Sequence, residues 1–443
     1  MSEHVPRFRR SQRHDSVRYR TKRSTCCAAG PNRHKSKHRH VNGEEMSCVT
    51  IDAPPASAGL QSFFVAGFEC SSHRRADGIR LDLIAATGHD RFAASDFARL
   101  AALGVTTVRD GMRWHLIEKG PGFYDWSSVL PMLRAARDAR VQVIWDLCHY
   151  GYPDKLDIWS PAFVDRFARF AREAARFVRS ESDDVPYYCP INEMSYWAWA
   201  GGDMRQFNPM TKGRGPELKR QLARAAIAAI EAVRSVDPRA RFLTAEPTIH
   251  VAPAKTSASA KAAAEGYRLS QFEATDMLAG RLHPEMGGSP DKLDIVGVNF
   301  YPQNQWVLGG GTIPMGHHDY RPFRDMLAET AARYGRPVLI SETGAEGTGR
   351  AAWLHYVCDE VAAARDDGVQ VEGITLYPIL DYPGWDNGRI CEVGLFTTPN
   401  GNGERAVFKP LAEELARRRT QFEREARWDL PGRVVPIRRG AAS

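Results

Sequence analysis

The sequence has few cysteines, no long hydrophobic run and no glycine-rich phosphate loop. Eight cysteines in 443 residues are too few for a disulfide scaffold, so we expect reduced thiols and a cytoplasmic location. No apolar stretch approaches the ~20 residues that a membrane-spanning helix needs. Residues 67–72, which follow the first predicted strand, lack the glycine pattern of a dinucleotide-binding turn. These absences exclude a membrane-spanning helix, a disulfide-rich scaffold and a simple dinucleotide-binding sheet.

The positive charge is confined to the N-terminal part of the chain. Residues 1–45 contain twelve Lys and Arg against four Asp and Glu, a net of +8, so the remainder sums to −1 within the total of +7. A nearly neutral remainder has no broad surface for phosphates, and we expect no nucleic-acid partner. The sequence specifies no oligomeric state.

Three segments are expected. Residues 1–58 are rich in Arg, Lys, Ser and His and poor in large apolar residues, which predicts a disordered basic tail, with Met46 as an alternative start of translation. Residues 60–428 are expected to form a single large domain, because they contain enough apolar residues for one large core. Residues 429–443 form a C-terminal tail.

Short apolar runs alternate eight times with amphipathic segments after residue 58. The runs predict strands at residues 63–68, 105–109, 141–147, 187–191, 241–245, 293–299, 338–341 and 373–380. The segments between them predict helices at residues 95–103, 161–179, 217–235, 321–334, 350–367 and 409–427. Ser95 and Ser160 are expected to begin helices, and Gly104 and Gly335 to end them. Eight such units predict a (β/α)₈ barrel, a TIM barrel of the α/β class.

In such a barrel, functional side chains gather at the carboxyl ends of the strands. Two carboxylates stand at strand ends here, Glu193 after residues 187–192 and Glu342 after residues 337–341. Taken singly, each is more often a surface acid or a helix cap. Together at one barrel mouth they match the pair of carboxyls that glycoside hydrolysis requires, one to stabilise the anomeric carbon and one to protonate the leaving oxygen.

The motifs around these acids resemble those of retaining (β/α)₈ glycosidases of clan A, and most closely glycoside hydrolase family 1, the β-glucosidase and β-galactosidase group. The resemblance covers roughly residues 60–425. Its motifs are Arg109–Trp114 with Phe123–Trp126, Asp146–Tyr150, Asn192–Glu193, Gly297–Tyr301, Ser341–Gly344, Tyr377–Trp385 and Val393–Phe396.

The resemblance implies a retaining β-glycosidase that hydrolyses a small β-glycoside or oligosaccharide and uses no metal or organic cofactor. Glu342 would be the nucleophile, kept ionised by Arg109 and hydrogen-bonded by Tyr301. Glu193 would be the acid and base, with a pKa that falls once the glycosyl ester forms. The sugar would be bound by the 2-hydroxyl contact of Asn192 and by the side chains His149 and Trp385.

Two further residues carry open interpretations. Glu246 is a third strand-end carboxylate, for which substrate contact and a structural ion pair are equally plausible. Trp197 lies four residues after Glu193, the expected acid/base residue. We interpret it, with Trp199, as a platform that stacks on sugar rings, and packing within a helix is the alternative.

The chain also departs from the family pattern. Tyr377 stands where the family has Trp, and Gly384 stands where the family has a Glu that binds the outer hydroxyls of the sugar. The identity of the sugar is therefore left open. Asp381, Asp386 or Asn387 are candidates to replace the missing carboxylate. Two alternative hypotheses also remain: a transglycosidase that uses the same glycosyl-enzyme, and a catalytically silent barrel that only binds sugars.

Overall fold

Eight parallel strands close into a barrel in the computed structural model, which describes residues 59–428. Around the barrel the strands follow the order β1, β12, β11, β9, β7, β6, β5 and β2, and β2 pairs again with β1. They are β1 (Phe64–Gly67), β2 (Thr107–Gly111), β5 (Gln142–Asp146), β6 (Tyr187–Cys189), β7 (Arg241–Pro247), β9 (Ile295–Asn299), β11 (Val338–Thr343) and β12 (Val371–Leu376). The predicted (β/α)₈ barrel is confirmed.

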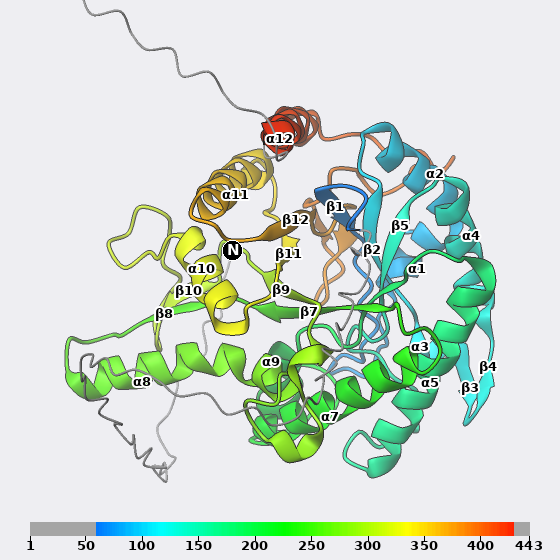
Figure 1. Ribbon diagram of the computed structural model, residues 1–443, viewed down its shortest axis with the longest axis horizontal. Helices are drawn as coiled ribbons and strands as arrows, with labels where there is room; N and C mark the ends of the chain where they lie inside the picture. The colour runs from blue at the N-terminus through cyan, green and yellow to red at the C-terminus, as the bar shows by residue number, and fades with distance from the viewer. Residues whose placement is uncertain (1–58, 429–443) are drawn as a thin grey trace, which may run out of the picture. The chain divides into compact units, whose positions relative to one another are not determined.

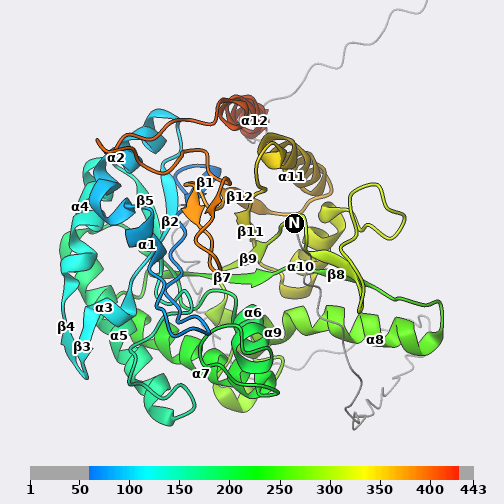
Figure 2. The same ribbon diagram turned by 180° about the vertical axis from the view of Figure 1, so that it is seen from behind.

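Helices surround the strands as an outer ring (Figures 1 and 2). They are α1 (Leu83–Ala86), α2 (His89–Ala102), α3 (Trp114–Ile117), α4 (Leu130–Asp138), α5 (Pro161–Glu181), α6 (Met194–Trp197), α7 (Gly215–Arg234), α8 (Ala258–Leu269), α9 (Glu273–Leu278), α10 (Phe323–Tyr334), α11 (Gly349–Asp366) and α12 (Lys409–Trp428). In α5, Phe163, Phe167 and Phe170 recur at helical spacing, and this buried stripe packs on Trp114.

Three small two-stranded sheets lie in the loops. They are β3 (Glu118–Gly120) with β4 (Phe123–Tyr124), β8 (His250–Ala252) with β10 (Gln305–Val307), and β13 (Tyr382–Pro383) with β14 (Ile390–Cys391). The last of these shapes the loop after β12 that contains Gly384, so this loop has a defined conformation beside the barrel mouth.

The helix boundaries follow the sequence signals except at one helix. Ser160 and Pro161 begin α5, and Gly335 ends α10 with a φ of 60°. The predicted start of a helix at Ser95 is wrong, because α2 begins at His89 and the Ser95 hydroxyl donates to the carbonyl of Phe92 (2.9 Å) inside the helix. A serine that bonds the preceding turn no longer serves as a cap.

The interior of the barrel changes from apolar to polar along the strands. A buried apolar layer fills its lower part, formed by Val65, Ile144, Tyr187, Leu243, Ile295 and Leu339. Two residues further along the same strands, the same inward face carries small or polar side chains, because successive residues of a strand point to opposite sides. The functional residues are therefore concentrated above a packed base, at the carboxyl ends of the strands.

Within residues 59–428, every helix is too short or too polar to cross a bilayer. The predicted basic tail at residues 1–58, with Met46, and the C-terminal tail at residues 429–443 lie outside the described residues.

A buried ionic network joins the first two units of the barrel. His89 is fully buried against Phe68, with ring centroids 3.6 Å apart. Its two ring nitrogens lie 2.9 Å from Asp96 and 3.0 Å from Asp110. Arg405 donates to Asp96 from the other side (2.7 Å). Because both imidazole nitrogens face carboxylates, this arrangement is complete only when His89 carries its second proton.

This network predicts a pH dependence of stability. Burial lowers the pKa of His89, but Asp110 and Asp96 outweigh it and raise the pKa to about 9 from an ordinary 6.5. A folded pKa above the unfolded one gives stability that is complete below the unfolded pKa and is lost as pH rises through the folded pKa. We expect His89 to contribute up to about 3 kcal/mol at pH 6 that disappears by pH 9 to 10.

The measurement is urea unfolding of wild type and His89→Gln at a series of pH values. The free energy of unfolding of wild type should fall between pH 6.5 and 9, and His89→Gln should lose this slope. His115→Gln is the matched control, because burial lowers the pKa of His115 to about 3 and leaves it neutral over this range. Parallel curves for wild type and His89→Gln would contradict the assignment.

Candidate active site

Glu193 and Glu342 reach the same mouth of the barrel from β6 and β11, which are separated by β7 and β9. Glu342 lies inside β11 and is almost completely buried. Glu193 follows β6 in a left-handed conformation with φ of 43°, and its N–H donates to the carbonyl of Ala245 (2.8 Å). This conformation costs a non-glycine residue about 1–2 kcal/mol, a cost that is typical of functional sites.

Both carboxylate oxygens of Glu342 accept hydrogen bonds from buried donors. Arg109 donates from Nη1 to Oε1 (2.8 Å), and the Tyr301 hydroxyl donates to Oε2 (2.9 Å). The two partners predicted for this carboxylate are therefore in contact with it, and they fix its orientation toward the barrel mouth.

Arg109 is the centre of a larger network that the sequence did not predict. Its guanidinium is fully buried and donates to both oxygens of Asp146 (2.8 Å each). A further N–H donates to Oδ1 of Asn192 (2.6 Å), beside Glu193. Arg109 thus links the strand ends of β2, β5, β6 and β11 through charge-assisted bonds, which are the stronger kind.

Glu193 is held by a second set of donors. The Tyr150 hydroxyl donates to Oε2 (2.6 Å), and the Asn299 amide donates to Oε1 (2.9 Å). Asn299 is itself oriented by the hydroxyl of Ser341, which donates to its Oδ1 (2.6 Å). No role was predicted for Tyr150 or Asn299, although Asn299 stands at a strand end, the one signal that could have found it.

Burial dominates the titration of the two acids. It raises the pKa of Glu193, and it raises the pKa of Glu342 to about 7, with the charge of Glu193 adding to the effect. The guanidinium of Arg109 lowers the pKa of Glu342, as predicted, but does not outweigh burial. The expectation that Arg109 by itself keeps Glu342 ionised is therefore too simple.

Asn192 and His149 lie in the same network. The Asn192 amide nitrogen lies 2.9 Å from Nε2 of His149, and Nδ1 of His149 lies 3.0 Å from Asp146. Both ring nitrogens of His149 therefore have protein partners. Its predicted contact with a sugar hydroxyl stays a prediction, and so does the contact predicted for Asn192.

Solved structures match this chain, whereas no protein-family model and no curated protein does. A family 1 β-glucosidase from Thermotoga maritima has a TM-score of 0.66 and 15% identity, over 82% of this chain and 97% of its own. The AHE enzyme from Alicyclobacillus herbarius gives 0.67 and 18% identity, over 82% and 99%. A mutant of the rice β-glucosidase Os3BGlu6, in a covalent complex with Glc, gives 0.65 and 16% identity, over 80% and 97%.

The fold is that of the family 1 β-glucosidases. The resemblance found in the sequence motifs is confirmed at the level of the fold, and it extends over nearly the whole length of these structures. The departures from the family 1 pattern are therefore substitutions within a shared barrel rather than signs of another architecture.

The structure gives Glu246 a role that the sequence did not suggest. Its two carboxylate oxygens accept the backbone N–H groups of Met194 (2.7 Å) and Ser195 (3.1 Å), at the start of α6. A carboxylate at the first N–H groups of a helix satisfies donors that the helix leaves unpaired. Burial raises the pKa of Glu246 to about 7. Glu246 therefore holds the turn that follows Glu193 and forms no ion pair with any of the described residues. Its contact with a substrate stays a prediction.

The platform predicted at Trp197 is also wrong. The indole is completely buried, its Nε1 donates to the carbonyl of Asn208 (2.8 Å), and its ring packs on Tyr150 and Tyr152. A helix turns every 3.6 residues, so positions two residues apart do not share one face, and Trp197 became core while Trp199 stayed nearer the surface. Trp199, two residues on, is only partly buried.

Trp385 lies on the loop after β12 and reaches back to the first unit of the barrel. Its ring centroid lies 4.6 Å from that of His73 and 5.8 Å from that of Tyr150, which bonds Glu193. Its buried Nε1 donates to none of the described residues. Sugar binding by Trp385 stays a prediction that this position beside Tyr150 supports.

The candidates to replace the missing carboxylate at Gly384 are used elsewhere or lie outside the mouth. Asp381 accepts the N–H of Gly394 (2.8 Å) and lies 3.7 Å from Arg350. Asp386 and Asn387 are exposed, and Asn387 accepts the N–H of Arg389 (3.0 Å). Asp381 therefore shapes the loop, and the other two have no buried position from which to hold a sugar.

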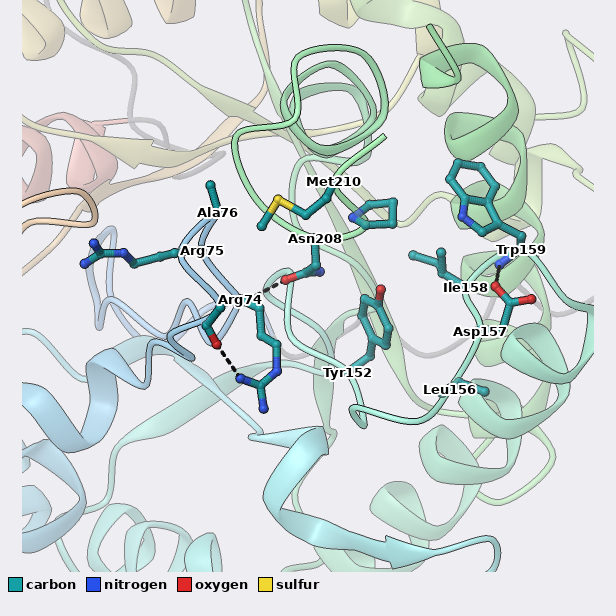
Figure 3. A pocket seen from close by; sticks show the side chains of 12 residues that line it. Arg74, Arg75, Ala76, Tyr152, Leu156, Asp157, Ile158, Trp159, Asn208 and Met210 are labelled. Atoms are coloured by element: carbon teal, nitrogen blue, oxygen red, sulfur yellow. Dashed lines mark hydrogen bonds between the residues drawn. The ribbon is translucent and has the colours of Figure 1, made fainter. Parts of the chain in front are cut away.

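A side pocket of about 400 Å³ opens between the loops after β1, β5 and β6 (Figure 3). Its polar groups already bind one another. Arg74 forms an ion pair with Asp154, and its backbone N–H donates to Asn208 (2.5 Å), whose amide donates to the carbonyl of Tyr150 (3.0 Å). The pocket wall therefore supports the Tyr150 segment and leaves few polar groups free for a ligand.

One cluster at the mouth has the residue types of a metal site. Cys70, Asp146 and His149 place a thiol, a carboxylate and an imidazole close together. Arg109 already neutralises Asp146 through two hydrogen bonds, and burial raises the pKa of the Cys70 thiol well above its ordinary value. A protonated thiol beside a guanidinium is a poor ligand set for a cation.

The buried position of Trp197 gives a prediction. Trp197→Ala should lower the free energy of unfolding by about 3–5 kcal/mol, because a large side chain leaves a cavity in a packed core. Trp199→Ala, at the partly buried neighbour, is the control and should cost clearly less. Urea unfolding of both variants is the measurement. Equal losses for the two variants would contradict the assignment of Trp197 to the packed core.

Proposed function

We propose that this protein is a retaining β-glycosidase that hydrolyses a small β-glycoside or oligosaccharide, with Glu342 as nucleophile and Glu193 as acid and base. One observation carries the proposal: two carboxyls at the ends of β6 and β11, the buried Glu342 and the half-buried Glu193, are oriented by one continuous network through Arg109, Asn192 and Tyr150. Glycoside hydrolysis with retention needs two carboxyls that act together on one sugar. The likeness of the fold to family 1 β-glucosidases supports the same conclusion.

In the first step, a carboxylate oxygen of Glu342 attacks the anomeric carbon while Glu193 gives its proton to the departing oxygen. The glycosidic bond breaks, a glycosyl ester of Glu342 forms, and the aglycone leaves as an alcohol. In the second step Glu193 removes a proton from water, which attacks the anomeric carbon and releases the sugar and the Glu342 carboxylate. The rice β-glucosidase of the same fold was captured in a covalent complex with Glc.

The surroundings of the two acids support this division of roles. Of the two acids, Glu342 is the one that contacts the guanidinium of Arg109, which favours its ionised form. Burial raises the pKa of Glu193, and the charge of Glu246 adds to the effect. Like charges also oppose the ionisation of Glu193 and Glu342 together, which favours a protonated Glu193 in the first step. Once Glu342 is esterified its charge is gone, and Glu193 becomes a base.

Two observations bear on the location of the protein and on the alternative functions. Cys70, Cys148, Cys189 and Cys391 are free thiols, which supports a reducing cytoplasm as the place of action. The intact set of acids and donors supports an active enzyme over a silent barrel, because a barrel that only binds has no need of a nucleophile held by Arg109 and Tyr301. Transfer to an alcohol would use the same glycosyl-enzyme.

The nucleophile is tested by trapping. Incubation with a panel of activated 2-deoxy-2-fluoro β-glycosides should add one sugar mass to the protein, because the fluorine slows release of the ester more than its formation. Peptide mass mapping should place the label on Glu342. Glu346→Gln is the matched control, since Glu346 is an exposed acid of the same segment that pairs with Arg389, and it should label as wild type does. Labelling elsewhere, or full activity of Glu342→Ala, would refute the assignment.

The role of Glu193 as the acid/base residue is tested by how the rate depends on the leaving group. Glu193→Ala should slow aryl glycosides with poor leaving groups by about 10²-fold or more, and activated ones much less, since only the former need the proton. Azide should restore part of the rate and yield the β-glycosyl azide, because the small anion enters the space of the lost carboxyl. Equal losses on both substrates, with no effect of azide, would count against Glu193.

A further inference from the structure

The first barrel strand places an unassigned carboxylate at the mouth. Val65 belongs to the apolar layer inside the barrel, and successive residues of a strand alternate between its faces. Gly67, the last residue of β1, therefore points inward as Val65 does, whereas Phe68 points outward and stacks on His89. Glu69 follows the strand, and its charge acts on Tyr377, His149 and Glu342 at the mouth. Glu69 is only 6% exposed, so it extends the polar end of the barrel interior.

Only one oxygen of Glu69 has a partner within the protein. The backbone N–H of Ser71 donates to Oε1 (2.9 Å), and the Ser71 hydroxyl donates to the same atom. Oε2 accepts no hydrogen bond from any residue of the described chain. Oε2 is not shut off from solvent as the hydroxyl of Tyr377 is, so a ligand that enters the mouth can reach it and donate to it.

Tyr377 adds an unpaired hydroxyl to the same wall. Its ring covers Gly67, where an added Cβ would lie 2.0 Å from the ring carbon Cδ2. The ring also stacks parallel to His149, and its hydroxyl is buried without a partner among the described residues. The charge of Glu69 contributes to raising the pKa of Tyr377 and of Glu342, after burial, which agrees with its place beside the reacting carboxyls.

We propose that Glu69 determines the specificity of the glycon site, by accepting hydrogen bonds from ring hydroxyls of an uncharged sugar, with the Tyr377 hydroxyl beside it. This rests on the proposed glycosidase function. Glu69 thereby takes over, from the β1 side, the role of the carboxylate that is missing at Gly384 on the β12 side. Gly384 leaves space on one side of the sugar ring, and Glu69 binds the hydroxyls of that ring from the other side.

The charges at the mouth set the class of sugar. Glu69, Asp146, Glu193 and Glu342 are carboxyl groups around a single guanidinium, that of Arg109. A further negative charge on the substrate would be repelled at short range. Arg214 is bound to Glu217 and Arg389 is bound to Glu346, so neither guanidinium is available for a phosphate. The mouth therefore disfavours glycons that carry a phosphate or a carboxylate.

The test compares Glu69→Ala and Glu69→Gln with wild type on aryl β-glycosides and on their 3-, 4- and 6-deoxy analogues. Glu69→Ala should lower kcat/KM for the preferred parent sugar by about 10- to 100-fold, the value of a hydrogen bond to a charged group. The loss should shrink to within about threefold on the analogue that lacks the bound hydroxyl. Glu69→Gln keeps an acceptor for Ser71 and should lose less than Glu69→Ala.

Asp367→Asn is the control, because Asp367 is an exposed acid before the amino end of β12, opposite the mouth, and its kcat/KM should stay within about twofold of wild type. Thermal midpoints confirm folding, and the isosteric Glu69→Gln decides the matter if Glu69→Ala unfolds. A loss that is equal on parent and deoxy sugars, or no loss, would overturn the proposal while leaving the glycosidase intact. Efficient cleavage of 6-phospho-glycosides or glucuronides by wild type would also overturn it. A wild type that cleaves no glycoside would refute the glycosidase function itself.

Discussion

Arg109 holds the catalytic end of the barrel together, because its guanidinium lies between Asp146, Asn192 and Glu342 on three other strands. A fully buried cation is costly unless every N–H finds an acceptor, and here the strand ends supply those acceptors. The positions of Glu342 and, through Asn192, of Glu193 therefore depend on one side chain. Substituting Lys would retain the charge but lose the planar fork that satisfies several acceptors at once.

Around this centre, other buried groups serve the geometry of the acids rather than the sugar. Glu246 satisfies the first N–H groups of α6 and so fixes the left-handed turn at Glu193. Trp197 fills the core behind Tyr150, which bonds Glu193. The strain at Glu193 is sustained because the backbone on both sides is anchored. Rigid support of this kind lets a hydrogen-bonded pair of acids keep its orientation through two chemical steps.

Two positions at the mouth bear on the proposed sugar specificity. Gly384 removes an acid on the β12 loop, and Glu69 adds one at the end of β1, next to Tyr377. The periodicity of the sequence predicts that β1 exists, yet it does not single out Glu69, because one acid after an apolar run is common. The role of Glu69 is suggested only by its position at the mouth and by the side chains around it there.

The sequence by itself determined the barrel, because the alternation of apolar runs with helical stripes is a local pattern that repeats eight times. It also predicted that Glu193, Glu342, Arg109 and Tyr301 lie together at the mouth, since the carboxyl ends of parallel strands must meet at one rim. The tertiary structure alone decided which residues contact one another there. Trp197 became core and Glu246 a helix cap, and Asp146, Tyr150 and Asn299 entered the network, because side-chain direction and burial depend on strands far apart in the chain.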